Sequence, residues 1–388
     1  MKKIQSVISK FKSLYTSDPS VFRAPGRINI IGEHTDYNNG FVLPTAINKE
    51  MYFAITPNTE QKIRLFAYDL DESFEISLSE ITKQTKCAWA NYLLGVIHQL
   101  QKHEIPIQGV NVVFGGNIPI GSGISSSAAI ECGFLYALNK LFNLQLDNIT
   151  ITKFAQKAEH EYAGVNCGIM DQFAVVFSKE DTVIKLDCKT LEYEYVPLFL
   201  HDYKIILCDS NVSHNLATSE YNIRRDQCNE GVDLISKKFS FVSSLRDVSI
   251  SLLEECRQLL PEIIYNRCLY VVEENNRVLA MCDALQESNY FRVGELLYES
   301  HEGLQHLYEV SCKELDELVE IAKNTPGVLG ARMMGGGFGG CTLQIVHNSS
   351  VNRFVAIIQK EYYEKHHKQE NIIIAELTKG VSEINLHK

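Results

Sequence analysis

The chain has 388 residues, of which 45% are hydrophobic and 22% are charged, and its formal net charge is −11 at pH 7. This composition is typical of a soluble globular protein and excludes a disordered or fibrous chain. Because no cluster of lysine and arginine could neutralise phosphates along a strand, we expect no nucleic acid partner.

The N-terminal residues predict an amphipathic helix, since Ile4, Val7, Ile8, Phe11 and Leu14 recur at helical spacing. We expect this helix to pack on the protein's own body, with a membrane-surface helix as the alternative. No apolar run has the length of a signal peptide or a transmembrane helix. The eleven cysteines are irregularly spaced and predict reduced thiols. We therefore expect a cytoplasmic protein without a membrane partner.

Residues 21–40 predict a strand that runs into a structured polar loop. Residues 23–40 have the sequence RAPGRINIIGEHTDYNNG, with turn-forming Pro25-Gly26 near the start and Asn38-Asn39-Gly40 at the end. Carboxylates accept from adjacent hydroxyls, and a neutral imidazole donates or accepts once, so Glu33, His34 and Asp36 suit a polyol. A solvated turn with a helix cap is the alternative, but it does not require arginine, two acids and histidine so close together.

The next segments predict strands at 51–56 and 63–68, a helix at 89–101 and a strand at 109–114. A glycine-rich loop follows, with the sequence GGNIPIGSGISSSAA over residues 115–129, and a helix is expected at 125–141. Free N–H groups at a helix start behind such a loop bind anions, and phosphate is the natural occupant. Ser122 stands where a Walker loop requires lysine, so backbone dipoles and a metal would have to meet the phosphate charge. A tight glycine turn that caps a helix is the alternative.

Two acidic residues that follow this loop in the sequence are candidates for a role in catalysis. A helix is expected at 152–162, with Glu159 off its apolar stripe, and residues 164–173 predict a turn into another helix. By local pattern alone, Glu159 is more often a surface residue. Asp171 is either an acid of a helix first turn or a partly buried functional group. Short strands are expected at 183–186 and 203–208.

The C-terminal half is mostly helical from 215 to 325, with strands expected at 328–334 and 342–347 around a second glycine cluster. This cluster, MGGGFGGCT at 334–342, formally matches G-x-G-x-x-G. We reject a dinucleotide site because a strand pattern, not a helix, follows. The cluster is expected to pack beside the phosphate loop. The order of elements predicts an α+β protein, and its length predicts two domains that meet near residues 190–205.

Taken together, these segments resemble the GHMP kinase superfamily and, within it, the galactokinase family. The resemblance extends over residues 23–40, 118–129, 158–160, 167–173, 296–315 and 330–341. The hexapeptide Gly-Glu-His-Thr-Asp-Tyr at 32–37 is its specific part, whereas the glycine-serine loop indicates only the superfamily. Ile124 stands where leucine is usual, a swap that conserves volume.

The resemblance implies a role for each matching residue. Asp171 is the expected catalytic base, and Arg27 the arginine that supports it. The sugar-binding residues are expected to be Glu33, His34, Thr35, Asp36, Gly168 and Tyr221. The ATP phosphates are expected to lie against Gly121, Ser122, Gly123, Ile124, Ser125, Ser126 and Ser127. Ser127 and Glu159 occupy the positions of the Mg²⁺ ligands.

The resemblance also implies the fold and the reaction. The expected fold is a ribosomal protein S5 domain 2-like domain over residues 1–195 and a ferredoxin-like domain over 196–388, with the active site in the cleft between them. The expected reaction is transfer of the ATP γ-phosphoryl group to the C1 hydroxyl of galactose, by a monomeric enzyme. The alternatives are a kinase for N-acetylgalactosamine or another C1 sugar hydroxyl, and a non-catalytic galactose sensor.

Overall fold

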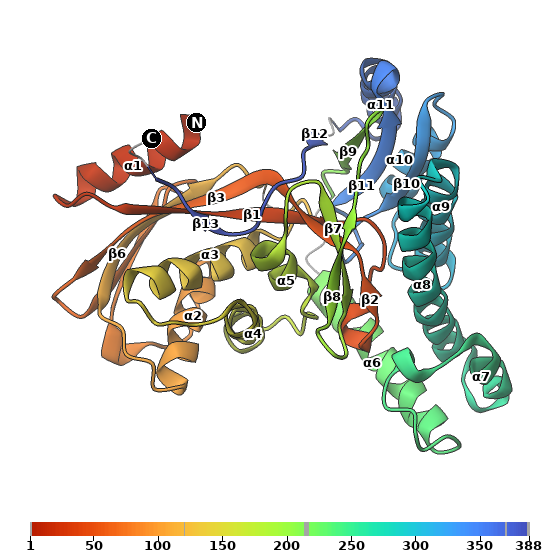
Figure 1. Cartoon of the computed structure of the whole chain (residues 1–388), viewed down its shortest axis with the longest axis horizontal. Coiled ribbons are helices and arrows are strands. Elements are labelled where there is room, and N and C mark those ends of the chain that lie inside the picture. Colours follow the sequence, from red (N-terminus) through yellow and green to blue (C-terminus); the bar gives the residue numbers. More distant parts are fainter. Residues whose placement is uncertain (1, 120, 213–216, 369–370, 386–388) are drawn as a thin grey trace.

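The computed structural model describes residues 2–119, 121–212, 217–368 and 371–385. Ile120 of the phosphate loop and residues 215 and 216 of the expected helical stretch lie outside the described residues. Figure 1 shows a broad twisted sheet with helices on both faces, joined to a second part that contains a smaller sheet and long helices. The expected mixture of helices and strands is confirmed.

A six-stranded sheet organises the first half of the chain, in the order β13-β1-β3-β6-β4-β5 (Figure 1). Its neighbouring strands are antiparallel, except that β4 and β6 run parallel. The strands expected at 51–56, 63–68 and 109–114 are confirmed. The members of the sheet are β1 (Ser20–Asn29), β3 (Pro44–Asn58), β4 (Lys62–Ala67), β5 (Glu72–Ser77), β6 (Gly109–Gly116) and β13 (Ser382–Glu383).

Side chains of a strand point alternately to the two faces of the sheet. Both faces of this sheet carry buried apolar side chains, and helices cover each of them. Ala54 and Val113 face α1 (Lys2–Leu14), whose Phe11 is fully buried, so the expected packing of the N-terminal helix is confirmed. Phe53 and Val112 belong to the main core on the opposite face. The helices there are α2 (Ala90–Lys102), α3 (Ser126–Leu141), α4 (Asn148–Ala158) and α5 (Met170–Phe177).

Pro25 and Gly26 lie inside β1, so the turn predicted for them is wrong. The register between β1 and β3 shifts at this pair, as in a β-bulge. A Cβ atom on Gly26 would lie 2.7 Å from Cγ2 of Ile124. The backbone N–H of Arg27 also donates to the Ile124 carbonyl oxygen at 3.1 Å. The bulge therefore brings β1 into contact with the phosphate loop.

A four-stranded antiparallel sheet organises the second half, in the order β10-β11-β9-β12. Ile206 and Cys208 pack toward α10 (Lys313–Lys323) and α11 (Val351–His366). Ile205 and Leu207 point to the other face and join the main core with α9 (Tyr290–His306). The strands are β9 (Tyr203–Asp209), β10 (Val328–Met333), β11 (Cys341–His347) and β12 (Asn371–Ala375).

The remaining elements complete the second part. Three helices, α6 (Ala217–Ser236), α7 (Ile250–Glu255) and α8 (Glu262–Gln286), confirm the expected helical stretch where it is described. Strand β11 follows the second glycine cluster directly, so the rejection of a dinucleotide fold is confirmed. A small sheet links the two parts through β2 (Phe41–Val42), β7 (Thr182–Asp187) and β8 (Tyr193–Pro197). The boundary between 195 and 196 falls inside β8 and stays a prediction.

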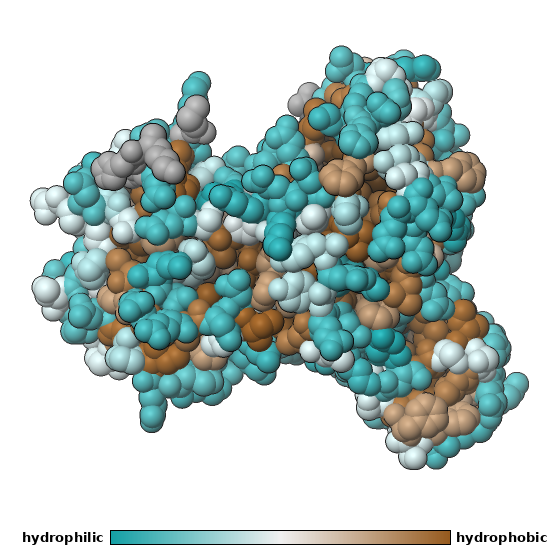
Figure 2. Space-filling model, viewed as in Figure 1, coloured by the Kyte–Doolittle hydropathy of each residue, from teal (hydrophilic) through white to brown (hydrophobic). Residues whose placement is uncertain are grey.

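The surface is mostly hydrophilic on the face drawn in Figure 2. Apolar side chains gather on the lobe at the lower right, where Figure 1 shows α7. Exposed apolar side chains in this part of the sequence are Phe241, Ile250, Leu259 and Ile263. Within the described ranges, no helix is both long enough and apolar enough to cross a membrane. Among the described residues the cysteines form no disulfide, and most of them are buried.

Candidate active site

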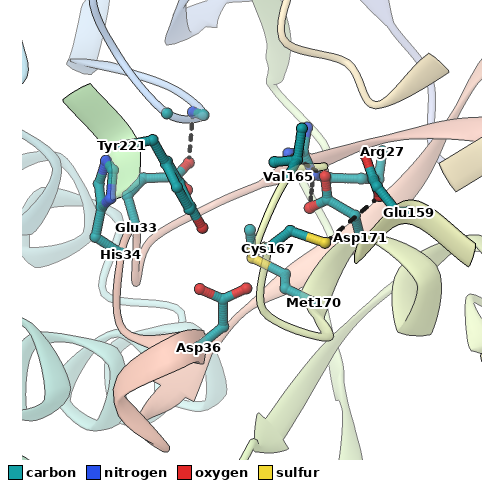
Figure 3. Close-up of a pocket in the computed structure, with 12 residues that line it drawn as sticks. Arg27, Glu33, His34, Asp36, Glu159, Val165, Cys167, Met170, Asp171 and Tyr221 are labelled. Carbon is teal, nitrogen blue, oxygen red and sulfur yellow. Dashed lines mark hydrogen bonds and ion pairs between the residues drawn. The ribbon is translucent and has the colours of Figure 1, made fainter. Parts of the chain in front are cut away.

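One cavity brings together most of the predicted site residues (Figure 3). Glu33, His34 and Tyr221 lie on one side, and Arg27, Glu159 and Asp171 face them from the other. Asp36 lies between the two groups. The full lining is Arg27, Glu33, His34, Asp36, Glu159, Val165, Cys167, Met170, Asp171, Tyr221, Gly335 and Gly336.

The carboxylate of Glu33 is buried and held on one oxygen. Its Oε1 accepts from Nη2 of Arg332 at 2.8 Å and from the backbone N–H of Gly335 at 2.9 Å. Both donors lie in the C-terminal half of the chain. The residue still borders the cavity, so its position suits it to accept a hydrogen bond from a hydroxyl of a bound ligand.

His34 is a neutral imidazole in an aromatic cluster. Burial lowers the pKa of His34 to about 3, and the Arg224 and Arg332 charges act in the same direction. Its Nδ1 lies 2.7 Å from the hydroxyl oxygen of Tyr37. The Tyr221 ring lies 5.3 Å away, centroid to centroid, which places Tyr221 on the cavity wall beside the imidazole.

Asp36 sits against Gly168. Burial raises the pKa of Asp36 to about 7, and the charge of Asp171 adds to this effect. Its Oδ1 accepts from the backbone N–H of Tyr37 at 2.9 Å. A Cβ atom on Gly168 would lie only 1.9 Å from Oδ2 of Asp36. Gly168 does not line the cavity itself, but the absence of a side chain there allows Asp36 to occupy its place.

Thr35 does not line the cavity. It is fully buried, and its hydroxyl oxygen lies 2.8 Å from the Gly32 carbonyl oxygen and 2.6 Å from that of Phe41. The side chain therefore closes the polar loop on itself. This geometry supports a role in shaping the loop and gives no support to the expected sugar contact.

Asp171 is held by three donors from two other segments. Arg27 binds it in a bidentate pair, with Nε 2.8 Å from Oδ1 and Nη2 2.9 Å from Oδ2. Ser125 donates its hydroxyl to Oδ2. Burial alone would lower the pKa of Arg27, but the carboxylates of Asp171, Glu33 and Asp36 raise it above its ordinary value. Asp171 lies in the first turn of α5, yet both its oxygens are bonded outside that helix.

The phosphate loop ends at the start of α3. Gly121 and Gly123 have φ values of 78° and 73°, which favour glycine, and Ser125 precedes the helix with φ 58°. The first N–H groups of α3 lack helical partners and point toward the loop. Ser122 turns inward and donates its hydroxyl to the Pro119 carbonyl oxygen at 2.8 Å. The side chains of Ser122 and the buried Ile124 are therefore turned away from the loop's anion site, and only the backbone of these two residues is available to bind an anion.

The second glycine cluster packs beside this loop, as the sequence predicts. A Cβ atom on Gly335 would lie 3.5 Å from the Gly123 carbonyl oxygen, and one on Gly340 would lie 3.7 Å from that of Ser122. The Arg27 guanidinium also donates to the Gly123 carbonyl oxygen. The polar loop, the phosphate loop and the second glycine cluster thus meet at one place.

Glu159 is buried, so the reading of it as a surface glutamate is wrong. It begins a π-helical turn, η3 (Glu159–Ala163), a geometry that is frequent at functional sites. Its Oε2 accepts from Nε2 of Gln172 at 2.7 Å. Burial raises the pKa of Glu159 to about 7, Asp171 adds to this, and the Ser127 hydroxyl bond opposes it. A hydroxyl and a carboxylate in contact, with a second carboxylate near, form a hard-oxygen donor set that fits Mg²⁺.

Sequence reasoning missed several contacts. Cys167 lines the cavity, and its Sγ lies 3.5 Å from Oε2 of Glu159. Ser125 was expected to bind phosphate and not to contact Asp171. Arg332 was not singled out, although an arginine inside a buried strand just before a glycine cluster is an unusual signal.

The chain matches known proteins over most of its length. Family models for the GHMP kinases N terminal domain, the galactokinase galactose-binding signature and the GHMP kinases C terminal match residues 91–179, 9–57 and 281–364. A galactokinase of Thermosipho africanus (strain TCF52B) is 44% identical over 343 residues, which cover 88% of this chain and 94% of that protein. One of Thermotoga maritima is 42% identical over 347 residues, with coverage of 89% and 94%.

A solved structure is also similar. The crystal structure of Lactococcus lactis galactokinase complexed with galactose has a TM-score of 0.94 and 35% sequence identity. The match covers 98% of this chain and 99% of that chain. The likeness therefore extends over both halves of the fold.

Proposed function

The chain belongs to the galactokinase family of the GHMP kinases, and we propose from this premise that it transfers the γ-phosphoryl group of ATP to the C1 hydroxyl of α-D-galactose. The products are galactose 1-phosphate and ADP. The observation that carries the proposal is the bidentate Arg27–Asp171 pair, which faces Glu33, His34 and Asp36 across one cavity (Figure 3). The phosphate loop contacts this pair, since the Ser125 hydroxyl donates to Asp171 and the Gly123 carbonyl oxygen accepts from Arg27.

The residues that line the cavity suggest how the sugar is bound and how its C1 hydroxyl is activated. Phosphoryl transfer depends mainly on positioning and charge stabilisation. Glu33, His34 and Asp36 hold the sugar hydroxyls, and Tyr221 limits the pocket beside them. Asp171 accepts the proton of the C1 hydroxyl. Since a carboxylate is a weak base, we expect the proton to move late, as the bond to phosphorus forms.

Arg27 holds Asp171 in place through its bidentate pair, and its guanidinium also donates to the Gly123 carbonyl oxygen of the phosphate loop. The N–H groups at the start of α3 donate hydrogen bonds to the ATP phosphates. Ser127 and Glu159 are the residues that would hold Mg²⁺, together with phosphate oxygens. The ion would supply positive charge that this loop, without a Walker lysine, does not provide. The absence of disulfides among the described cysteines favours a reducing compartment, so we place the enzyme in the cytoplasm. Its monomeric state stays a prediction.

The test is a coupled ADP-release assay with galactose, N-acetylgalactosamine, arabinose, fucose, glucose and mevalonate. We expect the highest kcat/KM for galactose. A higher value for N-acetylgalactosamine would assign the chain to that substrate. Calorimetric binding of galactose without any ADP release would support the sensor, although the phosphate loop, Glu159 and Asp171 are all in place for catalysis.

A further inference from the structure

Arg332 of β10 is fully buried beneath the polar loop and donates to four acceptors. Its Nε lies 2.8 Å from the Ile30 carbonyl oxygen, and its Nη1 lies 2.7 Å from that of Met333. Its Nη2 lies 2.7 Å from the Asn29 carbonyl oxygen and 2.8 Å from Oε1 of Glu33. A planar guanidinium can satisfy these acceptors together, whereas an ammonium cannot.

The bonds to Arg332 make the two oxygens of Glu33 different. Oε1 accepts from Arg332 and also from the N–H of Gly335, and Figure 3 shows this second bond at the edge of the cavity. Both donors belong to one short stretch of the chain, the end of β10 and the first glycine after it. Since Oε1 already has two donors, Oε2 is the oxygen available to a ligand in the cavity.

The main chain of Glu33 is held separately, from α8. The Tyr270 hydroxyl donates to the Glu33 carbonyl oxygen at 3.0 Å. The N–H of Gly32 donates to Oε1 of Glu274, a fully buried carboxylate, at 2.9 Å. The position of the loop therefore has anchors besides Arg332. The direction of the Glu33 side chain depends on Arg332 and Gly335.

We propose that Arg332 is a positioning residue for sugar recognition, which fixes Glu33 so that Oε2 alone accepts a hydrogen bond from one galactose hydroxyl. This inference rests on the proposed galactokinase function. It predicts that Arg332, which does not line the cavity, makes Glu33 present a hydrogen-bond acceptor to the sugar at this point.

The first experiment compares Arg332→Lys with Arg23→Lys. Arg23 is the matched control because it also ties β1 to the C-terminal segment, through Ser382 and the Lys379 carbonyl oxygen. We expect Arg332→Lys to weaken calorimetric galactose binding about 10- to 100-fold, the value of one hydrogen bond to a charged group. The KM for ATP should change by no more than about twofold, as should galactose binding by Arg23→Lys. Equal galactose affinity in the two variants would overturn the proposal.

The second experiment leaves Arg332 in place and uses Glu33→Gln. With donors from Arg332 and Gly335 on one side, the amide oxygen must take the place of Oε1, and the NH₂ group must face the cavity. Galactose and its 2-, 3-, 4- and 6-deoxyfluoro analogues are the probes, since fluorine cannot donate a proton. We expect one analogue to bind wild-type protein about tenfold or more weakly than galactose, and this penalty to disappear in Glu33→Gln.

A penalty that persists unchanged in Glu33→Gln, or the absence of any penalty in the wild type, would overturn the proposal. Wild-type turnover of galactose is measured beside these assays. If the wild type neither binds nor phosphorylates galactose, the proposed function fails. If it does both and the variants behave otherwise than expected, only the role of Arg332 fails.

Discussion

Asp171 and Asp36 are two aspartates at one cavity, and their surroundings give them different chemistry. Asp171 receives two bonds from Arg27 and one from Ser125. Asp36 is buried, lies near the Asp171 charge and has an N–H bond from Tyr37. The different partners support the different roles proposed for Asp171 as the base and for Asp36 as a hydroxyl acceptor, although the sequence shows the same residue at both positions.

Asp171→Asn keeps the shape of the side chain but cannot take up a proton. We expect kcat to fall about 10²- to 10⁴-fold, the usual loss for one well-placed acid or base. Galactose binding should change little, because the substituted side chain retains an amide oxygen for Arg27. The measurement is kcat from ADP release, with calorimetric binding of galactose as the control. Turnover near that of the wild type would refute the assignment of Asp171 as the base.

The pKa of Asp36 predicts how galactose binding depends on pH. Burial raises this pKa from 3.8 to about 7, Asp171 and Glu33 add to it, and N–H bonds from Tyr37 and Met170 oppose it. Hydroxyls that donate to the carboxylate favour its ionised form, so binding should lower the pKa. Affinity should therefore be highest above about pH 7 and should fall as the pH drops below it, toward the pKa of the complex.

Calorimetric titration of galactose between about pH 5.5 and pH 8 tests this expectation. Asp36→Asn is the control, which should bind more weakly but without the pH dependence. Wild-type affinity that is constant over this range, or that rises toward acid pH, would contradict the assigned role. His34 does not complicate the result, because its pKa is about 3.

The sequence motifs identified site residues but not the contacts that these residues make. The motif at residues 32–37 predicted Glu33, His34 and Asp36, which all line the cavity. The motif could not show that Thr35 differs from these three residues: its hydroxyl bonds to carbonyl oxygens of its own loop and does not face the cavity. It also could not find Arg332, which is 299 residues from Glu33 along the chain. Both outcomes depend on tertiary packing that no local pattern encodes.

Among the elements, the polar loop between β1 and β2 depends on an internal bond. Thr35→Val has nearly the same shape but would leave the Gly32 and Phe41 carbonyls without this hydroxyl. We expect the free energy of unfolding to fall by about 1–3 kcal/mol and galactose binding to weaken in parallel. Urea denaturation and calorimetry measure the two effects.

Thr35→Ser keeps the hydroxyl and serves as the control, with both properties close to those of the wild type. If Thr35→Val lost galactose binding at unchanged stability, the hydroxyl would have to contact the sugar directly. That outcome would favour the role expected from the resemblance over the one that the geometry supports.

Helices and strands were largely predictable from periodicity, whereas local irregularities were not. The pattern at 152–162 predicted one helix, but α4 ends at Ala158 and a π-helical turn follows. That turn carries Glu159 into the interior. The pair Pro25-Gly26 has turn chemistry, yet pairing with β3 on the one side and contact with Ile124 on the other keep it within β1. Both irregularities lie at the site, where tertiary contacts override local preference.

At the scale of the whole molecule, the two expected halves share one core. The main hydrophobic cluster joins Phe22 and Phe53 of the first sheet to Leu207 and Leu343 of the second. The C-terminal strand β13 pairs with β1, so the chain also returns to the first sheet. Length predicted two domains. It could not predict whether they would be stable separately, because that depends on how much apolar surface crosses between them.

This shared core predicts a single cooperative unfolding transition in calorimetry, with equal calorimetric and van't Hoff enthalpies. A fragment of residues 1–195 would lose β13 and the apolar partners from the second half, so we expect it to show no cooperative transition. Galactose should raise the midpoint temperature of the whole transition. The reason is that Arg27 and Asp36 from the first half of the chain and Tyr221 and Gly335 from the second half line the same cavity. Two resolved transitions, of which galactose shifts only one, would mean that the halves fold independently and that the sugar is held by one of them.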